Sequence, residues 1–198
     1  RKLLANAEDH AIVICAVGQL AGLAGLLDSP PDDIAPLSGT DLVQRKVRLL
    51  VTMAGGVWPE GNDQFNWNCD RPSAARVLNH WPGALAVSPS GGDILTGGRL
   101  CAETPKDNPI RRIYEIYVLN DTHQRPSWDQ CAVYYAVKGP DALFRAHPGV
   151  RLQYDAKTGH HQWNPDPASQ QICIEQQAPS KTIATTIENL MIEKKTSH

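Results

Sequence analysis

The chain has 198 residues, is 41% hydrophobic and carries a formal net charge of -2, which suits one globular domain with a sizeable core. Charges of both signs are interspersed without a block of five like charges, which argues against a nucleic-acid or anionic-membrane partner. The apolar run over residues 11–27 is interrupted by Gly18, Gln19, Gly22 and Gly25, which favours a strand and a helix over a membrane span.

The amino-terminal residues Arg1-Lys-Leu-Leu-Ala-Asn-Ala-Glu8 contain no methionine and look like the end of an amphipathic helix. We therefore expect that further sequence precedes Arg1. The compartment stays undetermined. None of the five cysteines forms a Cys-x-x-Cys pair, so we expect free thiols rather than a zinc site or a disulfide framework.

The first half of the chain alternates between predicted strands and helices. The continuous apolar run 11–17 is typical of a buried parallel strand, and 20–27 carries leucines at helical spacing. Thr40 is placed to cap a helix over 41–45, and the β-rich run 47–53 follows. The next elements in order are a helix over 71–80 with Pro72 in its first turn and a strand over 84–87.

The second half continues with helices and a hairpin. Helices are predicted over 109–119 and 128–137, a hairpin over 150–163 with Gly159 in its turn, and a short strand over 172–175. Ser180 is placed to cap a closing helix with an apolar face of Ile183, Ile187, Leu190 and Met191. This alternation predicts a single α/β domain with a mainly parallel, doubly wound (Rossmann-like) sheet flanked by helices.

A polar loop over residues 58–66 separates the strand 47–53 from the helix 71–80. Asn62, Gln64 and Asn66 offer uncharged donors and acceptors at alternating positions, which suits sugar hydroxyls better than phosphate. Phe65 between them is expected to anchor the loop to the core. The alternative is an ordinary polar turn, because Asn and Gly are common turn residues.

An acidic residue, Asp129, stands at the start of the predicted helix 128–137. A carboxylate there compensates the helix dipole, and it is also a plausible cation ligand beside Trp128. Both interpretations stay open on the sequence alone.

Together these segments resemble the inosine-uridine preferring nucleoside hydrolase family. The order of Met53-Ala-Gly-Gly, Gly61-Asn62, Phe65-Asn66 and Asp70 with Ala74-Ala75 is similar to its ribose-binding segment. Val17-Gly-Gln-Leu-Ala-Gly-Leu-Ala24 is similar to its Gly-Pro-Leu-Thr-Asn-Leu-Ala segment. The resemblance covers roughly residues 11–140 and implies a nucleoside hydrolase-like fold.

The resemblance assigns roles to individual residues. Met53 matches the methionine that lines the ribose pocket, and Asn66 matches an asparagine that contacts the ribose hydroxyls. Gln64 stands where the family usually has Glu, and Asn62 matches only if the loop is shortened. Asp129 is implied as a ligand of Ca²⁺ and of ribose. A backbone carbonyl from Ala21 is implied as a further calcium ligand.

The proton donor of the family is replaced in this chain. Trp128 stands at the position of the family's leaving-group histidine, and its indole stacks on flat groups but does not act as a general acid. His123 precedes it in a polar loop and is a candidate acid, the alternative being a mobile loop histidine. The adjacent His160 and His161 are expected to form an exposed turn pair on opposite faces of a strand.

The family's Asp-x-Asp and Asp-Asp cluster is absent, and Asp32-Asp33 fits a solvated turn. By resemblance, the function is that of a nucleoside N-ribohydrolase that cleaves N-glycosidic bonds with calcium-activated water, and this chain alone is expected to be inactive. The alternatives are a non-catalytic riboside-binding relative and an unrelated α/β domain. The expected partner is a nucleoside or related riboside, and the oligomeric state, a homo-oligomer included, is left open.

Overall fold

The computed structural model describes residues 1–55, 58–63, 65–118 and 122–193. Within these ranges the strands are β1 (Ile12–Ala16), β2 (Val47–Met53), β3 (Glu60–Asn62), β4 (Leu85–Ser88), β5 (Leu95–Thr96), β6 (Arg125–Pro126), β7 (Phe144–Tyr154), β8 (His160–Pro165) and β9 (Gln171–Gln176). The helices are α1 (Lys2–Ala5), α2 (Ala21–Asp28), α3 (Gly39–Lys46), α4 (Arg71–His80), α5 (Leu100–Glu103), α6 (Pro109–Tyr117), α7 (Trp128–Lys138) and α8 (Ser180–Ile192).

The described strands form one mixed sheet in the order β1-β2-β4-β9-β7-β8-β3 and a short pair of β5 and β6. The pairs β1-β2, β2-β4 and β4-β9 are parallel, as the strand and helix alternation predicts. The predicted hairpin is confirmed as β7 and β8, and β7 pairs antiparallel with β9. The hairpin therefore extends the parallel sheet rather than forming a separate layer.

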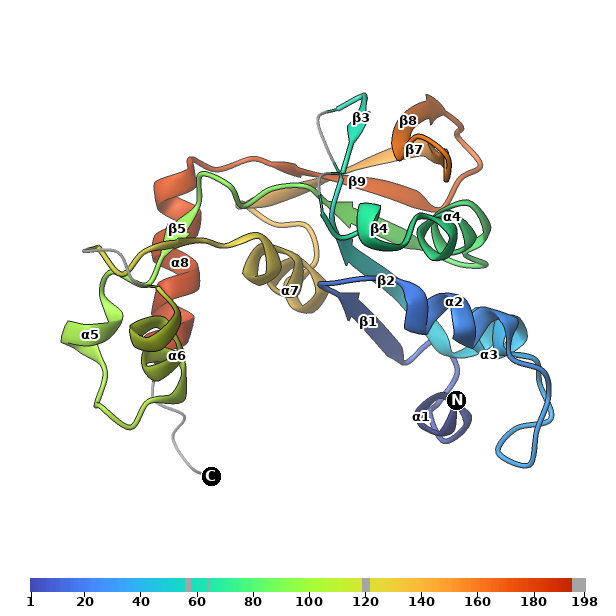
Figure 1. Ribbon diagram of the computed structural model, residues 1–198, viewed down its shortest axis with the longest axis horizontal. Helices are drawn as coiled ribbons and strands as arrows, with labels where there is room; N and C mark the ends of the chain where they lie inside the picture. The colour runs from blue at the N-terminus through green and yellow to red at the C-terminus, as the bar shows by residue number, and fades with distance from the viewer. Residues whose placement is uncertain (56–57, 64, 119–121, 194–198) are drawn as a thin grey trace.

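Successive residues of the central strands point to opposite, buried faces. Leu50 and Leu85 pack in one core cluster, whereas Val51 and Ala86 pack in another on the opposite side of the sheet. The first cluster includes residues of α2, α3 and α4, and the second includes residues of α7 and α8. Figure 1 shows α2 and α3 on one side of β1 and α7 on the other. The α/β class with helices on both faces is thus confirmed.

Local capping differs from prediction at two helices. Ser38, rather than Thr40, caps α3, because its hydroxyl oxygen accepts from the Asp41 amide at 3.1 Å, and α3 begins one residue earlier than Thr40. Ser180 does not cap α8 but is its first residue, and its hydroxyl donates to Asp93 in the loop after β4. In both cases the hydroxyl that we expected to cap a helix makes a tertiary hydrogen bond instead. Thr40 Oγ1 donates to the carbonyl of Leu27.

The apolar faces of two helices are narrower than predicted. On α8, Ile183 and Ile187 are buried, but Leu190 is half-exposed. On α6, Tyr114 is buried, whereas Ile113 and Tyr117 are exposed. The predicted last residue of that helix, Leu119, lies outside the described residues.

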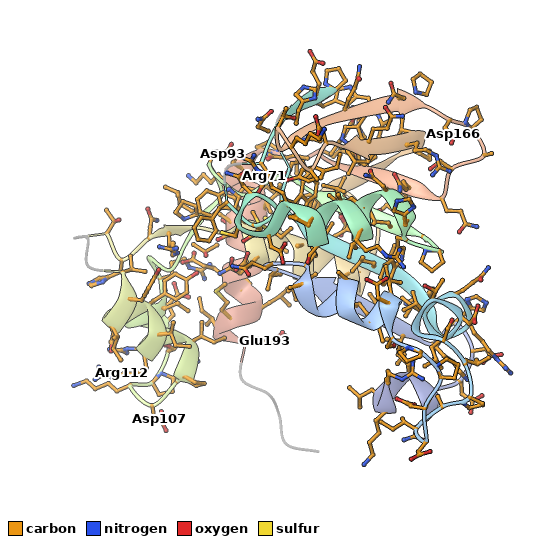
Figure 2. The ribbon with its side chains drawn as sticks, turned by 45° about the vertical axis from the view of Figure 1, so that its right-hand side comes forward. Arg71, Asp93, Asp107, Arg112, Asp166 and Glu193 are labelled. Atoms are coloured by element: carbon orange, nitrogen blue, oxygen red, sulfur yellow. The ribbon has the colours of Figure 1, made fainter. Side chains whose placement is uncertain are left out.

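A small unit formed by α5, α6, β5 and β6 packs on α8 at one end of the molecule (Figure 1). Its own apolar cluster contains Leu100, Tyr114 and Val118. Figure 2 shows Asp107 and Arg112 at the outer end of this unit, far from Arg71 at the start of α4. The unit therefore extends the domain away from the parallel strands.

The five cysteines are free, as predicted. No helix among the described residues is both long and apolar enough to cross a membrane.

Candidate functional site at the carboxyl edge of the sheet

The carboxyl ends of β1, β2 and β4 point toward α7 (Figure 1). Met53, the last residue of β2, lies opposite Ser88, the last residue of β4. In open α/β sheets, ligands bind outside this edge, where the loops after the strands gather. The loop after β2 and the start of α7 are the two segments that sequence singled out.

Asp63 holds the loop after β2 in shape. Its carboxylate is almost fully buried and accepts from the backbone amides of Gly55 at 3.1 Å, Phe65 at 3.0 Å and Trp67 at 2.8 Å. Three charge-assisted hydrogen bonds from main chain fix the loop without a regular element. Sequence analysis missed Asp63. The sequence signal is that Asp63 precedes two of these amides, those of Phe65 and Trp67, by two and four residues. This spacing is typical of a turn in which an aspartate side chain accepts from the backbone.

The predicted anchor of this loop is wrong. Phe65 is 73% exposed, whereas Trp67 is fully buried. The indole of Trp67 packs edge-on against Tyr154 and His161, at ring-centroid distances of 5.7 Å each. The larger ring, two residues further on, fills the core, and Phe65 is left at the surface.

The amide of Asn66 is bound to the end of β2. Nδ2 donates to the Met53 carbonyl at 2.9 Å and contacts the Met53 sulfur at 3.1 Å. Because Nδ2 is occupied, Oδ1 is the atom that remains to accept from a ligand hydroxyl. The side chain of Met53 in turn packs against the core cluster that contains α7 residues. Met53 thus connects the loop to the α7 side of the sheet.

The other two amides are placed less favourably. Asn62 is exposed on the edge strand β3, opposite His160 of β8. Gln64 lies outside the described residues. Of the three amides singled out from sequence, Asn66 is therefore the one that the structure ties to the end of a parallel strand.

The start of α7 packs against the loop after β4. The Ser127 amide donates to the Gly91 carbonyl at 3.0 Å, and a Cβ atom at Gly91 would lie 2.4 Å from the Cα of Trp128. Gly91 has a φ of +139°, which favours glycine. Gly92 lies under the indole of Trp128. The Gly-Gly pair after β4, unremarked in the sequence, sets the position of Trp128 and Asp129.

The environment of Asp129 links it to β1. Partial burial raises the pKa of Asp129, and the charge of Arg125 acts in the opposite direction. Burial, and to a lesser extent the charge of Asp129, raises the pKa of Cys15 on β1 to about 11. Asp129 is therefore close enough to the end of β1 for its charge to affect Cys15, and α7 packs on both β1 and β2.

The residues present do not complete a calcium site. Within the described residues no group of three or more His, Cys, Asp or Glu side chains is placed to hold a metal ion. Ala21 is the first residue of α2, where a carbonyl normally accepts a hydrogen bond within the helix. Calcium prefers six to eight oxygen ligands, so Asp129 and one carbonyl are too few.

The histidines lie in three different settings. His123 follows α6 in the left-handed region, with φ of 50°, and its Nδ1 lies 3.3 Å from the Val118 carbonyl. His160 is partly exposed, but His161 is buried beside Trp67, so the expected exposed pair is wrong for His161. Strand alternation places the two rings on opposite faces, as predicted, and the inward ring fills the core.

Ser88 was not recognised from sequence. It is fully buried at the end of β4, and its Oγ has no hydrogen-bond partner among the residues that the structure describes. A buried hydroxyl of this kind costs free energy. A serine at the last position of an apolar strand is the only signal that the sequence offers.

A shallow pocket of about 570 Å³ lies at the opposite edge of the sheet. It is lined by residues that precede or begin the parallel strands, among them Val47, Ala84 and Gln171. Because the chemistry-bearing loops follow the strands rather than precede them, this pocket does not coincide with the candidate site.

No protein-family model matches the chain, and no curated protein matches it.

Proposed function

We propose that this protein binds a nucleoside or a related riboside at the carboxyl edge of β1, β2 and β4, as a nucleoside N-ribohydrolase-like protein with a nucleoside hydrolase-like fold. The observation that carries the proposal is the contact of Asn66 with Met53 at the end of β2. This contact holds an uncharged acceptor at the end of β2, and α7, whose first turn contains Asp129, packs on the same strand. An uncharged amide and a single carboxylate suit neutral hydroxyl groups better than phosphate.

In this proposal Asn66 Oδ1 accepts a hydrogen bond from a sugar hydroxyl. Asp129 accepts a second one and places negative charge near a sugar ring that becomes cation-like when the N-glycosidic bond breaks. Gln64 and Asn62 are further sugar contacts that the family resemblance implies. By the family resemblance, Trp128 stands at the leaving-group position, and His123 is the candidate proton donor that the sequence offers.

Calcium, when bound in such proteins, orients and activates the attacking water. Because the residues described here do not complete its coordination, no step is assigned to it. Hydrolysis would require carboxylates in addition to Asp129.

A non-catalytic riboside-binding protein is the second candidate function. The lack of a clustered carboxylate group among the described residues favours it over an active enzyme. Both candidates share the same sugar site, and they differ in whether the bond is cleaved.

Isothermal titration of the 198-residue chain with adenosine and with ribose tests the shared site. We expect both ligands to bind, and Asn66→Ala to weaken both by about tenfold, the effect of losing one hydrogen bond in a desolvated site. Asn164→Ala, which removes an exposed amide on β8 that donates to Gln153, is the matched control and should leave the affinity unchanged. If neither ligand binds, or if both variants act alike, the proposed site is wrong. Release of free base by the bound complex would separate the enzyme from the binder.

A further inference from the structure

A second group of chemistry-bearing side chains lies at the ends of β7 and β9. His147 Nδ1 is 2.7 Å from Glu175 Oε1, and Arg145 Nε donates to Glu175 Oε2 at 2.5 Å. The ring of Trp58, in the loop between β2 and β3, lies on the His147 ring with 4.4 Å between the centroids. Trp58 begins the polar loop over residues 58–66, but none of the four residues was predicted as a site residue, and none belongs to the proposed sugar site.

The geometry of this group places it on the same edge as the sugar site. Glu175 is the penultimate residue of β9, which runs parallel to β4. Neighbouring strands lie about 4.8 Å apart, so the three strand steps from β2, where Asn66 contacts Met53, to β7 span roughly 14 Å. The loop that starts after Met53 reaches this far, because the Pro59 carbonyl accepts from the Trp163 amide on β8 at 2.8 Å.

A bulge in β7 helps to aim the histidine. The register between β7 and β9 shifts between His147 and Val150, and Gly149 in that interval has a φ of +73°. Bulges of this kind turn a side chain away from the regular direction of the strand, often next to a functional site. Arg145 lies directly opposite Glu175 in the same ladder, so it holds the carboxylate from the other side.

Glu175 fixes which nitrogen of His147 carries the proton. Partial burial acts to raise the pKa of Glu175, but the hydrogen bonds from Arg145 and His147 outweigh it, so the pKa lies below its usual value. The ionised carboxylate is an acceptor only, so Nδ1 of His147 donates to it. Nε2 has no hydrogen bond to another described residue and is free for a ligand.

We propose that Trp58 and His147 form the subsite for the leaving base of the nucleoside, with Glu175 as a positioning residue. This inference rests on the proposed function. The ring of Trp58, 38% exposed, stacks on a planar heteroaromatic base such as a purine. Nε2 of His147 hydrogen-bonds to a ring nitrogen of that base. His147 meets this role better than His123, whose Nδ1 lies against the Val118 carbonyl in the connection after α6.

The test titrates three separate probes, adenine, adenosine and ribose, into the 198-residue chain. We expect Trp58→Leu and His147→Gln each to weaken adenine and adenosine binding by about tenfold, the usual size of a lost base-stacking or hydrogen-bond contact, and to leave ribose unchanged. His160→Gln is the matched control, because His160 on the neighbouring strand β8 is similarly exposed and lies near a glutamate, Glu60 of β3. It should leave all three affinities near the wild-type values.

The outcomes separate this inference from the proposed function. If adenosine binds, Asn66→Ala weakens it, and Trp58→Leu and His147→Gln do not, the subsite is wrong and the sugar site stands. If adenine binds and both variants weaken it while ribose fails to bind, the base subsite stands without the sugar site. If ribose binds but adenine and adenosine do not, the base subsite is wrong. If none of the three probes binds, both proposals fail.

The positioning role of Glu175 has a spectroscopic test. In the wild-type protein, nitrogen-15 shifts of neutral His147 should show the proton on Nδ1. In Glu175→Gln the side chain loses its charge, and we expect a mixture of the two tautomers and weaker adenine binding. An unchanged tautomer in Glu175→Gln would remove Glu175 from this role. Circular dichroism of each variant checks that the fold is kept.

Discussion

At the scale of single residues, one buried carboxylate has the largest structural role in the candidate site. The carboxylate of Asp63 accepts hydrogen bonds from three backbone amides of the loop after β2 and so holds that loop in one conformation. Asn66 reaches Met53 from the loop that Asp63 closes. The sugar site therefore depends on a residue that does not itself face the ligand.

We expect Asp63→Ala to destabilise the protein by about 3 kcal/mol, because buried amides lose charge-assisted hydrogen bonds. Urea denaturation measures this. Asp70→Ala, which removes a helix cap that accepts from the Ser73 amide at 3.2 Å, is the control and should cost about 1 kcal/mol. Equal losses in the two variants would show that Asp63 holds the loop no more firmly than an ordinary cap.

The thiol of Cys15 reports on Asp129. With the pKa of Cys15 at about 11, alkylation at this residue should be slow at pH 8 and should accelerate toward pH 11, because the thiolate is the reactive form. Asp129→Asn removes the charge, which is the smaller of the two causes of the raised pKa, and leaves the burial. The pH at which labelling is half-maximal should therefore fall but stay above that of an ordinary thiol. Site-resolved mass spectrometry of iodoacetamide labelling measures both profiles. A midpoint unaffected by Asp129→Asn would place Asp129 away from β1.

At the scale of elements, the contact between the loop after β4 and the start of α7 fixes half of the candidate site. We expect Gly91→Ala to be strongly destabilising, because the new Cβ would lie 2.4 Å from the Cα of Trp128 and because the φ of +139° strains any side chain. Gly22→Ala in α2 meets no atom within 4 Å and should stabilise by up to about 1 kcal/mol. Thermal unfolding of both variants tests the contrast, and similar midpoints would contradict it.

The packing of β8 against the loop predicts a pH dependence. Burial, and then the charge of His160, lowers the pKa of His161, while Asp63 acts in the opposite direction. The unfolded chain therefore binds a proton more readily than the folded protein. The contribution of His161 is complete above its unfolded pKa of about 6.5 and is lost as the pH falls toward the folded pKa.

We expect His161→Phe to flatten the fall in unfolding free energy below about pH 6.5. His160→Gln changes a partly exposed ring and serves as the control. Urea titrations between pH 5 and pH 8 provide the measurement. A slope that His161→Phe leaves unchanged would show that another group controls acid stability.

At the scale of the whole molecule, the described side chains along the carboxyl edge do not form a complete metal site. We expect isothermal titration of the 198-residue chain with CaCl₂ to show no specific binding, because Asp129 and a carbonyl cannot satisfy the ion. Tight, stoichiometric binding would show that the ligands are elsewhere in this chain.

The elements of the sheet followed from the amino-acid sequence because their patterns are local. A continuous apolar run is typical of a strand buried on both faces, and it predicted β1 within one residue at each end. The β-rich run over 47–53 predicted β2. Pro72 and Gly159 fixed a helix start and a hairpin turn through backbone restrictions that need no partner. Asp129 and Asn66 were singled out by residue type and position, and their proposed roles came from the family resemblance.

Tertiary structure decided which side chains meet. Trp67 displaced Phe65 as the anchor of the loop, because the space beside Tyr154 and His161 arises only when β8 is in place. The approach of His147 to Glu175 depends on the pairing of β7 with β9, 28 residues apart in sequence. Local patterns carry no information on such a pairing, since it is selected by the packing free energy of the complete sheet.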